Sequence, residues 1–145
     1  MSKKVKSKFT PKSKEIVSAN PDAFYSENPS WCFNSCDKEC WQLEKHAFWS
    51  ELLPKFKGLE TQHWQEILVT AKKENHQINV SLLNKKARDR LNDLCIEAEA
   101  IMSIRLQGTH RLYGYMQKSA FCVLWYDTNH GDNDECVCRS RKKHT

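Results

Sequence analysis

The stretch that most constrains the fold is residues 101–130, IMSIRLQGTHRLYGYMQKSAFCVLWYDTNH, which contains three strand-like segments. Apolar and polar residues alternate over 102–107 and again over 111–116, and a period of two predicts half-buried strands. A nearly continuous apolar run then covers Ala120–Tyr126, which predicts a strand that is covered on both faces and central in the sheet. Three antiparallel strands joined by short turns are therefore expected in the second half of the chain.

The pairing of the first two strands depends on the length of the turn between them. A two-residue turn would mix the two faces, whereas a three-residue turn at residues 107–109 keeps apolar side chains together. The second register is preferred, because a slip of one residue inverts a whole strand face. It predicts Arg105 opposite Arg111, on a sheet face that also carries Tyr113 and Tyr115.

Two arginines at directly opposite positions repel each other, which is a cost unless a negative charge lies between them. One interpretation is that Asp127 or Glu135 neutralises the pair. The other is that the pair binds an anion such as phosphate, whose oxygens match the guanidinium geometry. The sequence leaves both interpretations open.

Helical patterns precede these strands. An apolar stripe predicts a helix over residues 43–56, which Pro54 should kink or end. Thr61 is a plausible N-cap for a second helix over residues 62–72. Trp49 and Trp64 lie on these stripes, so both are expected in the core.

Alternation over residues 76–82 predicts a further strand, and a third helix is expected from about residue 83 to residue 100. Residues 135–139 are expected to add a short edge strand. The predicted fold class is therefore α+β, with N-terminal helices packed on a four- or five-stranded, mainly antiparallel sheet.

The length of 145 residues allows one domain with a core of moderate size. No apolar run approaches the roughly 20 residues that cross a bilayer, and the basic N-terminus lacks the apolar region of a secretory signal. A cytoplasmic protein with no membrane partner is therefore expected. We expect a basic flexible arm over residues 1–20, a single domain over 21–139 and a basic tail over 140–145.

The formal net charge of +5 is concentrated at the two ends of the chain. Basic ends favour a polyanionic partner, nucleic acid before membrane, although they can also serve only to solubilise the chain. A basic cluster early in the third helix is either part of a phosphate-binding surface or a solvated helix face. The nucleic-acid-binding candidates are Lys85, Lys86, Arg88, Arg90, Arg139, Arg141 and, if its ring has an open face, Trp125.

Seven cysteines are many for this length, and an odd count without an export signal argues against a disulfide framework. Cys32, Cys36 and Cys40 recur at every fourth position, which is not the tight spacing of zinc or iron–sulfur sites. Cys136 and Cys138 complete a metal site only if the fold brings the two ends together; otherwise these are small buried thiols. No metal and no cofactor is assigned.

The segment RLQGTHRLYG at residues 105–114, followed by an apolar strand at 121–125, resembles the RelE/ParE-like toxins of bacterial toxin–antitoxin pairs. The segment WYDTNH at residues 125–130 also resembles a strand end in uncharacterised bacterial and phage-associated proteins. The resemblance covers roughly residues 78–139. It implies either a ribosome-dependent ribonuclease that cleaves mRNA or a gyrase inhibitor, with a small antitoxin as partner.

Metal-independent RNA cleavage needs a base, an acid and cations that stabilise the developing negative charge. Arg105 and Arg111 are the candidates to clamp a phosphate, and His130 or His76 to transfer protons near neutral pH. Tyr113 is a candidate to stack a base or donate a proton. Structural roles compete with these, because His130 lies in a polar loop and His76 lies at a helix–strand junction.

Three functions are therefore compatible with the sequence. The first is a toxin-like endoribonuclease that acts on RNA in a ribosomal context. The second is a module without enzymatic activity whose basic surface binds nucleic acid or an acidic antitoxin. The third is a regulator that binds a metal through the N-terminal cysteines.

Overall fold

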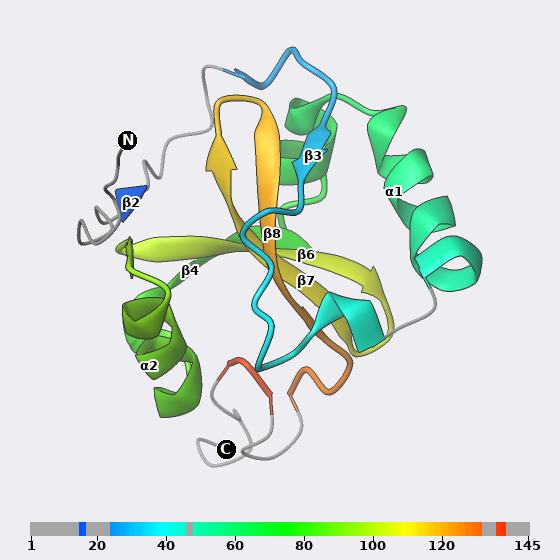
Figure 1. Ribbon diagram of the computed structural model, residues 1–145. Coiled ribbons are helices and arrows are strands. Elements are labelled where there is room, and N and C mark those ends of the chain that lie inside the picture. The colour runs from blue at the N-terminus through cyan, green and yellow to red at the C-terminus, as the bar shows by residue number, and fades with distance from the viewer. Residues whose placement is uncertain (1–14, 17–23, 46–47, 132–135, 139–145) are drawn as a thin grey trace, which may run out of the picture.

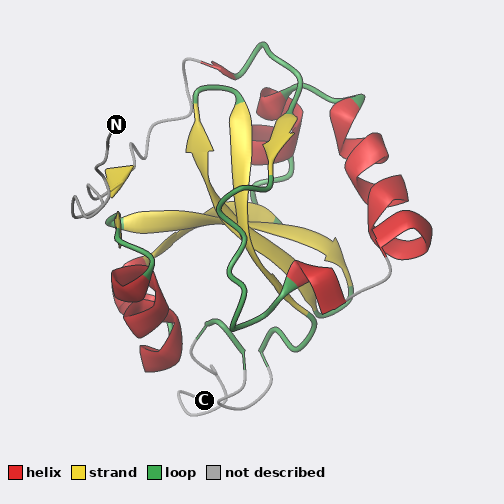
Figure 2. Cartoon of the chain, viewed as in Figure 1, coloured by secondary structure: helices red, strands yellow, loops and turns green. Residues whose placement is uncertain are grey.

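The computed structural model describes residues 15–16, 24–45, 48–131 and 136–138. It contains one five-stranded sheet, a separate strand pair and short helices (Figures 1 and 2). In chain order the elements are β2 (Glu15–Ile16), β3 (Ser30–Cys32), the 3-10 turn η2 (Leu43–Lys45), the π-helical turn η3 (Phe48–Leu52), α1 (Leu53–Glu60), the π-helical turn η4 (Glu66–Thr70), β4 (Asn75–Asn79), the 3-10 turn η5 (Val80–Leu82), α2 (Lys85–Asp93), β5 (Ile96–Glu97), β6 (Ala100–Gln107), β7 (His110–Gln117) and β8 (Ala120–Asp127).

The main sheet has the strand order β3–β8–β7–β6–β4. Within this sheet, β4, β6, β7 and β8 pair antiparallel, as expected. The strand β3 runs parallel to β8, which makes the sheet mixed. The α+β class is confirmed in these coarser terms. The expected packing of N-terminal helices on the sheet is not matched, because the first described strand of this sheet precedes every described helix and α1 begins only at Leu53.

The first hairpin has the predicted pairing but not the predicted turn. Arg105 lies opposite Arg111, yet Gln107 pairs with His110, so the turn between β6 and β7 contains two residues. A bulge between Arg105 and Gln107 takes up the extra residue and restores the register. Gly108 has a φ of +49°, in the region that a residue without a Cβ adopts readily.

Both faces of the sheet are covered by apolar clusters. On one face, Phe56 of α1 and Trp64 pack in the same cluster as Ile104 and Leu112. On the other face, residues of α2 pack in a cluster that includes Tyr113, Leu124 and Trp125. Figure 1 shows α1 and α2 on opposite sides of the sheet. The expectation that β8 is buried on both faces is confirmed, since Phe121–Asp127 are all buried.

The helix expected over 43–56 is broken into η2, η3 and α1. Pro54 lies in the first turn of α1, which continues directly from η3, so it does not end the helix as expected. Thr61 ends α1, with its Oγ1 donating to the Gly58 carbonyl at 2.7 Å, and does not cap the next helix. Trp64 is buried as expected, but Trp49 is 79% exposed.

Other expected elements are shorter than the sequence pattern indicates. The strand expected over 76–82 ends at Asn79, where η5 begins, and α2 ends at Asp93. Of the expected strand at 135–139, the described part shows a single antiparallel bridge between Cys138 and Leu83. No helix in the described ranges is long and apolar enough to cross a membrane. The expected arm and tail lie outside those ranges, apart from β2.

Candidate functional site

Two arginines face each other at the end of the sheet where β6 turns into β7. The side chain of Arg105 is exposed and forms no hydrogen bond or ion pair within the described ranges. The half-buried guanidinium of Arg111 donates to the carbonyls of Gly108 at 2.7 Å and His110 at 3.2 Å. Burial lowers the pKa of Arg111, and the positive charge of Arg105 lowers it further. The pair therefore presents two cations with little internal compensation.

Asp127 is opposite Arg111 in the register, but its carboxylate is used elsewhere. Its two oxygens accept hydrogen bonds from the backbone N–H groups of Asn129 and Val137, each at 2.8 Å. Burial raises the pKa of Asp127, against the effect of these hydrogen bonds. Among the described residues Asp127 forms no ion pair with either arginine, so it offsets their repulsion only in part.

Tyr113, two residues after Arg111 on β7, contacts His130. The Tyr113 hydroxyl lies 3.2 Å from Nδ1 of His130 and 3.1 Å from Sγ of Cys138. His130 is held in place through its backbone N–H, which donates to the Thr109 carbonyl at 3.0 Å. Tyr113 has no exposed surface, and burial raises the pKa of its hydroxyl far above the usual range. The expectation that Tyr113 stacks a base is therefore wrong, because its ring is enclosed by the core that α2 covers.

His76 is exposed on the edge strand β4, opposite Ser103, and its Nδ1 lies 3.2 Å from the Gln77 carbonyl. Ser103 in turn pairs with Tyr113. His76 is thus one row of side chains away from Arg105, about 7 Å along the sheet. The structure places four of the five predicted catalytic residues on two adjacent rows of one sheet face, and the fifth, His130, contacts that face from a loop.

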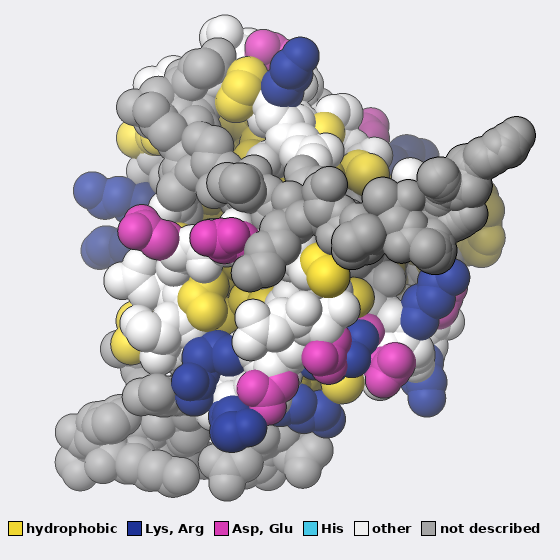
Figure 3. Space-filling model, turned by 60° about the vertical axis from the view of Figure 1, so that its left-hand side comes forward, with side chains coloured by type: hydrophobic (Ala, Val, Ile, Leu, Met, Phe, Trp, Pro, Cys, Tyr) yellow, Lys and Arg dark blue, Asp and Glu magenta, His cyan; other side chains and the backbone are white. Residues whose placement is uncertain are grey.

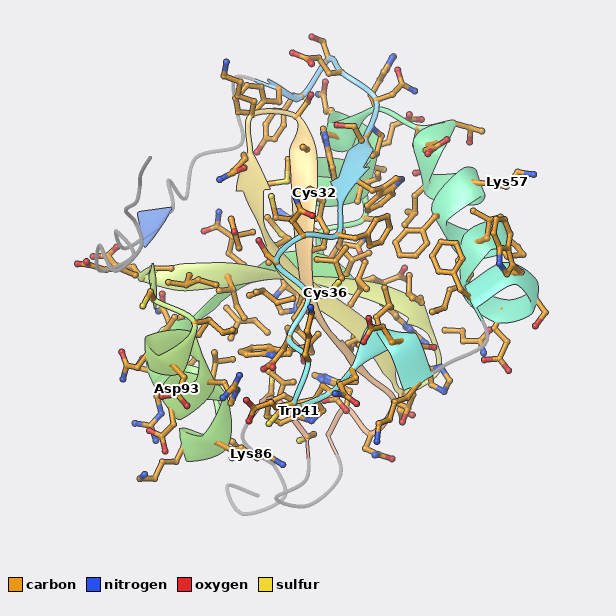
Figure 4. The ribbon with its side chains drawn as sticks, in the orientation of Figure 1. Cys32, Cys36, Trp41, Lys57, Lys86 and Asp93 are labelled. Atoms are coloured by element: carbon orange, nitrogen blue, oxygen red, sulfur yellow. The ribbon has the colours of Figure 1, made fainter. Side chains whose placement is uncertain are left out.

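The predicted nucleic-acid-binding residues of α2 are largely engaged within the protein. Lys85 forms an ion pair with Asp89 at 2.8 Å, and Nε of Arg88 donates to the Leu83 carbonyl at 3.2 Å. Lys86 lies over the ring of Trp41, 5.3 Å from its centroid, and Figure 4 shows the two side by side. Basic and acidic side chains alternate over this side of the molecule (Figure 3), which favours the solvated helix face over a continuous basic surface.

The predictions that Arg90 and Trp125 bind nucleic acid are both wrong, because the two side chains share a buried partner. Arg90 donates two hydrogen bonds of 2.9 Å to the buried carboxylate of Asp37, and Trp125 Nε1 donates a third at 2.9 Å. Trp125 is fully buried, so it has no open face on which a base can stack. Arg90 is not available to a phosphate, because a buried carboxylate requires charge-assisted partners. No pattern in the sequence indicates this contact, which joins residues 53 positions apart.

Arg139 and Arg141 lie outside the described residues. Cys138, the last described residue before them in the sequence, contacts Tyr113. The side-chain amide of Asn84 fixes this segment by donating to the carbonyls of Cys136 at 2.5 Å and Cys138 at 3.0 Å. Cys138 therefore lies beside the candidate site.

The cysteines do not form a recognisable metal centre. Within the described ranges, no three His, Cys, Asp or Glu side chains are grouped so that they could hold a metal ion. All seven cysteines lie in those ranges and none forms a disulfide. Burial raises the pKa of the Cys36 thiol to about 11, which disfavours the thiolate that a metal requires. Cys32, the end of β3, pairs in register with Cys122 and not with the C-terminal cysteines.

Two contacts near the arginine pair were not expected from the sequence. Lys55 of α1 donates to Oε1 of Gln107 at 2.6 Å, and Nδ1 of His110 lies 2.6 Å from the Tyr126 hydroxyl. These contacts join residues distant in the sequence, so periodicity carries no signal for them. They attach α1 and the end of β8 to the β6–β7 turn.

Comparison with known proteins adds no assignment: no family model, curated protein or solved structure matches the chain. The function must therefore be argued from the arrangement of the residues themselves.

Proposed function

We propose that this protein binds RNA, with one phosphate held between Arg105 and Arg111. The observation that carries the proposal is the direct pairing of these two arginines across β6 and β7, with Arg105 exposed and unpaired among the described residues. Like charges at paired positions destabilise a sheet. A phosphate placed between them removes that repulsion and accepts hydrogen bonds from both guanidinium groups.

The surroundings of the pair favour a polymeric anion over a small one. The basic sequence RSRKKHT, residues 139–145, follows Cys138 along the chain, and Cys138 contacts Tyr113, two residues from Arg111. The formal net charge of +5 adds long-range attraction. RNA is preferred to DNA because the resemblance to RelE-like toxins implies an RNA target, and the same segment, residues 105–114, supplies both the resemblance and the arginine pair.

The proposal is tested by titrating a fluorescein-labelled single-stranded RNA with the full chain at several salt concentrations. Arg105→Ala and Arg111→Ala should each raise Kd roughly 10- to 100-fold. Each should also lower the slope of log Kd against log salt by about 0.7 for every phosphate that the variant no longer neutralises. Arg105→Lys keeps the charge but not the bidentate geometry, so its Kd should lie between those of the wild type and Arg105→Ala.

Lys85→Ala is the matched control, because it removes one positive charge that is already paired with Asp89 on α2. Its Kd should stay within about twofold of the original value. Equal increases in Kd for Lys85→Ala and Arg105→Ala would show that only net charge matters and would overturn the proposed phosphate site.

RNA cleavage is a second candidate function, carried by the placement of His130. Its imidazole is partly exposed, bonded to Tyr113 and anchored to Thr109 beside the arginine pair. His130 can therefore take the 2′-OH proton as that oxygen attacks the phosphorus, and return it to the 5′-oxygen as the P–O bond to it breaks, while Arg105 and Arg111 stabilise the developing charge. Tyr113 would position the imidazole, since its hydroxyl has no surface through which to reach RNA.

Cleavage and binding separate in one experiment. His130→Ala should abolish the appearance of shortened RNA on a denaturing gel while the affinity measured by titration is retained. Arg111→Ala should weaken both. If the wild-type chain binds RNA and yields no product, alone or with ribosomes, the function reduces to binding.

The ribosome and a small antitoxin remain the proposed cellular partners, because the toxin resemblance implies both. Induction of the gene in a bacterial host should arrest growth, and Arg111→Ala should relieve the arrest. Growth that is unaffected by the wild-type protein would argue against a toxin.

A further inference from the structure

The largest exposed apolar side chain in the described part of the chain is Trp49, at 79% exposure. It lies in η3, the π-helical turn that leads into α1. Its ring forms a T-shaped contact with Phe48, with a centroid distance of 5.6 Å and an interplanar angle of 89°. Phe48 in turn contacts Phe33, which is 40% exposed. With 79% of its surface exposed, the Trp49 side chain is largely open to solvent.

Trp49 lies at the same end of the sheet as the arginine pair. Figure 1 shows the end of the α1 coil where η3 begins beside the turn between β6 and β7. The Lys55–Gln107 hydrogen bond of 2.6 Å fixes that proximity. Leu52 and Phe56 pack on the sheet face opposite to the face that carries Arg111. A ligand that touches both Trp49 and the arginines must therefore pass over the β6–β7 turn, which a flexible polymer can do.

The exposed apolar area around Trp49 is too small for a stable protein partner. An aromatic side chain carries about 150–250 Å², so Trp49 and Phe33 together expose roughly 300 Å². A specific protein interface needs about 800 Å² on each partner. The two residues that follow Trp49, Ser50 and Glu51, are polar and exposed. The exposed indole ring of Trp49 is instead about the size of one nucleic-acid base, which could stack on it.

We propose that Trp49 stacks a base of the RNA strand whose phosphate lies between Arg105 and Arg111. The inference rests on the proposed function and adds to it a second contact, on the other side of the β6–β7 turn. Stacking on an indole ring tolerates every base, because each base has a π-face. Trp49 therefore adds affinity for single strands without sequence preference, whereas a duplex, with its bases paired inside, gains nothing from it.

The test compares Trp49→Ala with Trp49→Phe, using single-stranded RNA of about 8 nucleotides, a length within the range that single-strand-binding domains cover. Trp49→Ala should raise Kd roughly 5- to 150-fold, the change expected for one stacked base, and Trp49→Phe should restore part of the affinity. Leu82→Ala is the control, since Leu82 is also an exposed apolar residue, at 49%, and lies in η5. It should leave Kd unchanged.

An abasic strand of the same length separates the two contacts, because it keeps the phosphates and lacks the bases. With this strand the effect of Trp49→Ala should disappear while the effect of Arg105→Ala persists. If both effects persist equally, Trp49 acts through folding and the stacking proposal is overturned. If RNA binds and responds to Arg105→Ala but not to Trp49→Ala, the inference fails while the phosphate site stands.

Self-association is the competing use of this ring, and light scattering detects it. The wild-type chain and Trp49→Ala should show the same mass in solution. A mass that falls on substitution would assign Trp49 to an interface between copies of the chain and would overturn the stacking proposal.

Discussion

The carboxylate of Asp37 accepts two hydrogen bonds of 2.9 Å from the guanidinium of Arg90 at a position where Asp37 has no exposed side-chain surface. Trp125 Nε1 donates to the same carboxylate at 2.9 Å, and the backbone N–H of Glu39 donates at 2.8 Å. Four hydrogen bonds thus compensate one buried charge. Together they attach the loop after β3 to both α2 and β8. The loop and α2 therefore stay packed on the sheet face that carries Tyr113.

Removing one member of this pair should be strongly destabilising. Arg90→Ala leaves a buried carboxylate without its counter-charge, which typically costs about 3–5 kcal/mol. Lys85→Ala, which breaks the exposed pair with Asp89 on the same helix, should cost no more than about 0.5 kcal/mol. Urea unfolding followed by far-UV circular dichroism measures both. If Arg90→Ala lowered the unfolding free energy by less than about 1 kcal/mol, water would have to reach Asp37.

The same pair predicts how stability depends on pH. Burial acts to raise the pKa of Asp37, but hydrogen bonds from Arg90, Trp125 and the Glu39 backbone outweigh it, and the pKa is lowered. A carboxyl with a lowered folded-state pKa stabilises the protein above its unfolded value of about 3.9, and this contribution is lost as the pH falls through the folded value. The difference in stability between wild type and Asp37→Asn should therefore be constant near neutral pH and shrink below about pH 4. Urea unfolding across that range would refute the prediction if the difference stayed constant.

Two glycines should respond in opposite directions to the same substitution. A Cβ at Gly114 would collide with the Cys122 carbonyl and lie 2.8 Å from the Phe121 ring, so Gly114→Ala forces two strands apart. A Cβ at Gly58, in α1, meets nothing within 4 Å. Gly58→Ala should therefore stabilise the protein by about 0.5–1 kcal/mol, and Gly114→Ala should destabilise it by about 1–3 kcal/mol. Thermal unfolding ranks the two variants, and a neutral Gly114→Ala would show that the strands can separate at little cost.

Local sequence patterns were sufficient to predict β6, β7 and β8 and the pairing of Arg105 with Arg111. They could not show that the face carrying Tyr113 is covered, because Tyr113 and Ser103 follow the polar half of the pattern while α2 and the C-terminal segment bury them. That burial depends on contacts such as Arg90 with Asp37, which are distant in sequence. The pairing of the two arginines was therefore predicted correctly, whereas the burial of the neighbouring Tyr113 was missed.

Around Pro54 the error was the reverse: the helix pattern predicted a buried residue that is exposed. An apolar stripe continued through residues 43–56, so Trp49 was expected in the core with Leu52 and Phe56. In the structure a π-helical turn precedes Pro54 and changes the angular spacing, which leaves Trp49 outside while the other two remain buried. The three-residue strand β3 was too short to show a period at all.

The Tyr113 hydroxyl is expected to position His130 and not to bind RNA itself. Tyr113→Phe keeps the buried ring and removes the hydroxyl that lies 3.2 Å from His130 Nδ1 and 3.1 Å from Cys138 Sγ. Its unfolding free energy should fall by about 1 kcal/mol, the usual value of one hydrogen bond. Tyr115→Phe is the matched control, since that buried hydroxyl bonds to Ser35 at 2.8 Å instead.

RNA affinity should stay within about twofold of wild type in Tyr113→Phe, because a hydroxyl with no exposed surface cannot touch RNA. If the protein cleaves RNA, the rate should fall in Tyr113→Phe and not in Tyr115→Phe, since Tyr113 is the tyrosine that orients His130. The RNA titration and a cleavage time course measure these quantities. A decrease in affinity in Tyr113→Phe as large as that of Arg111→Ala would show that the core opens when RNA binds, and Tyr113 would then be part of the binding surface.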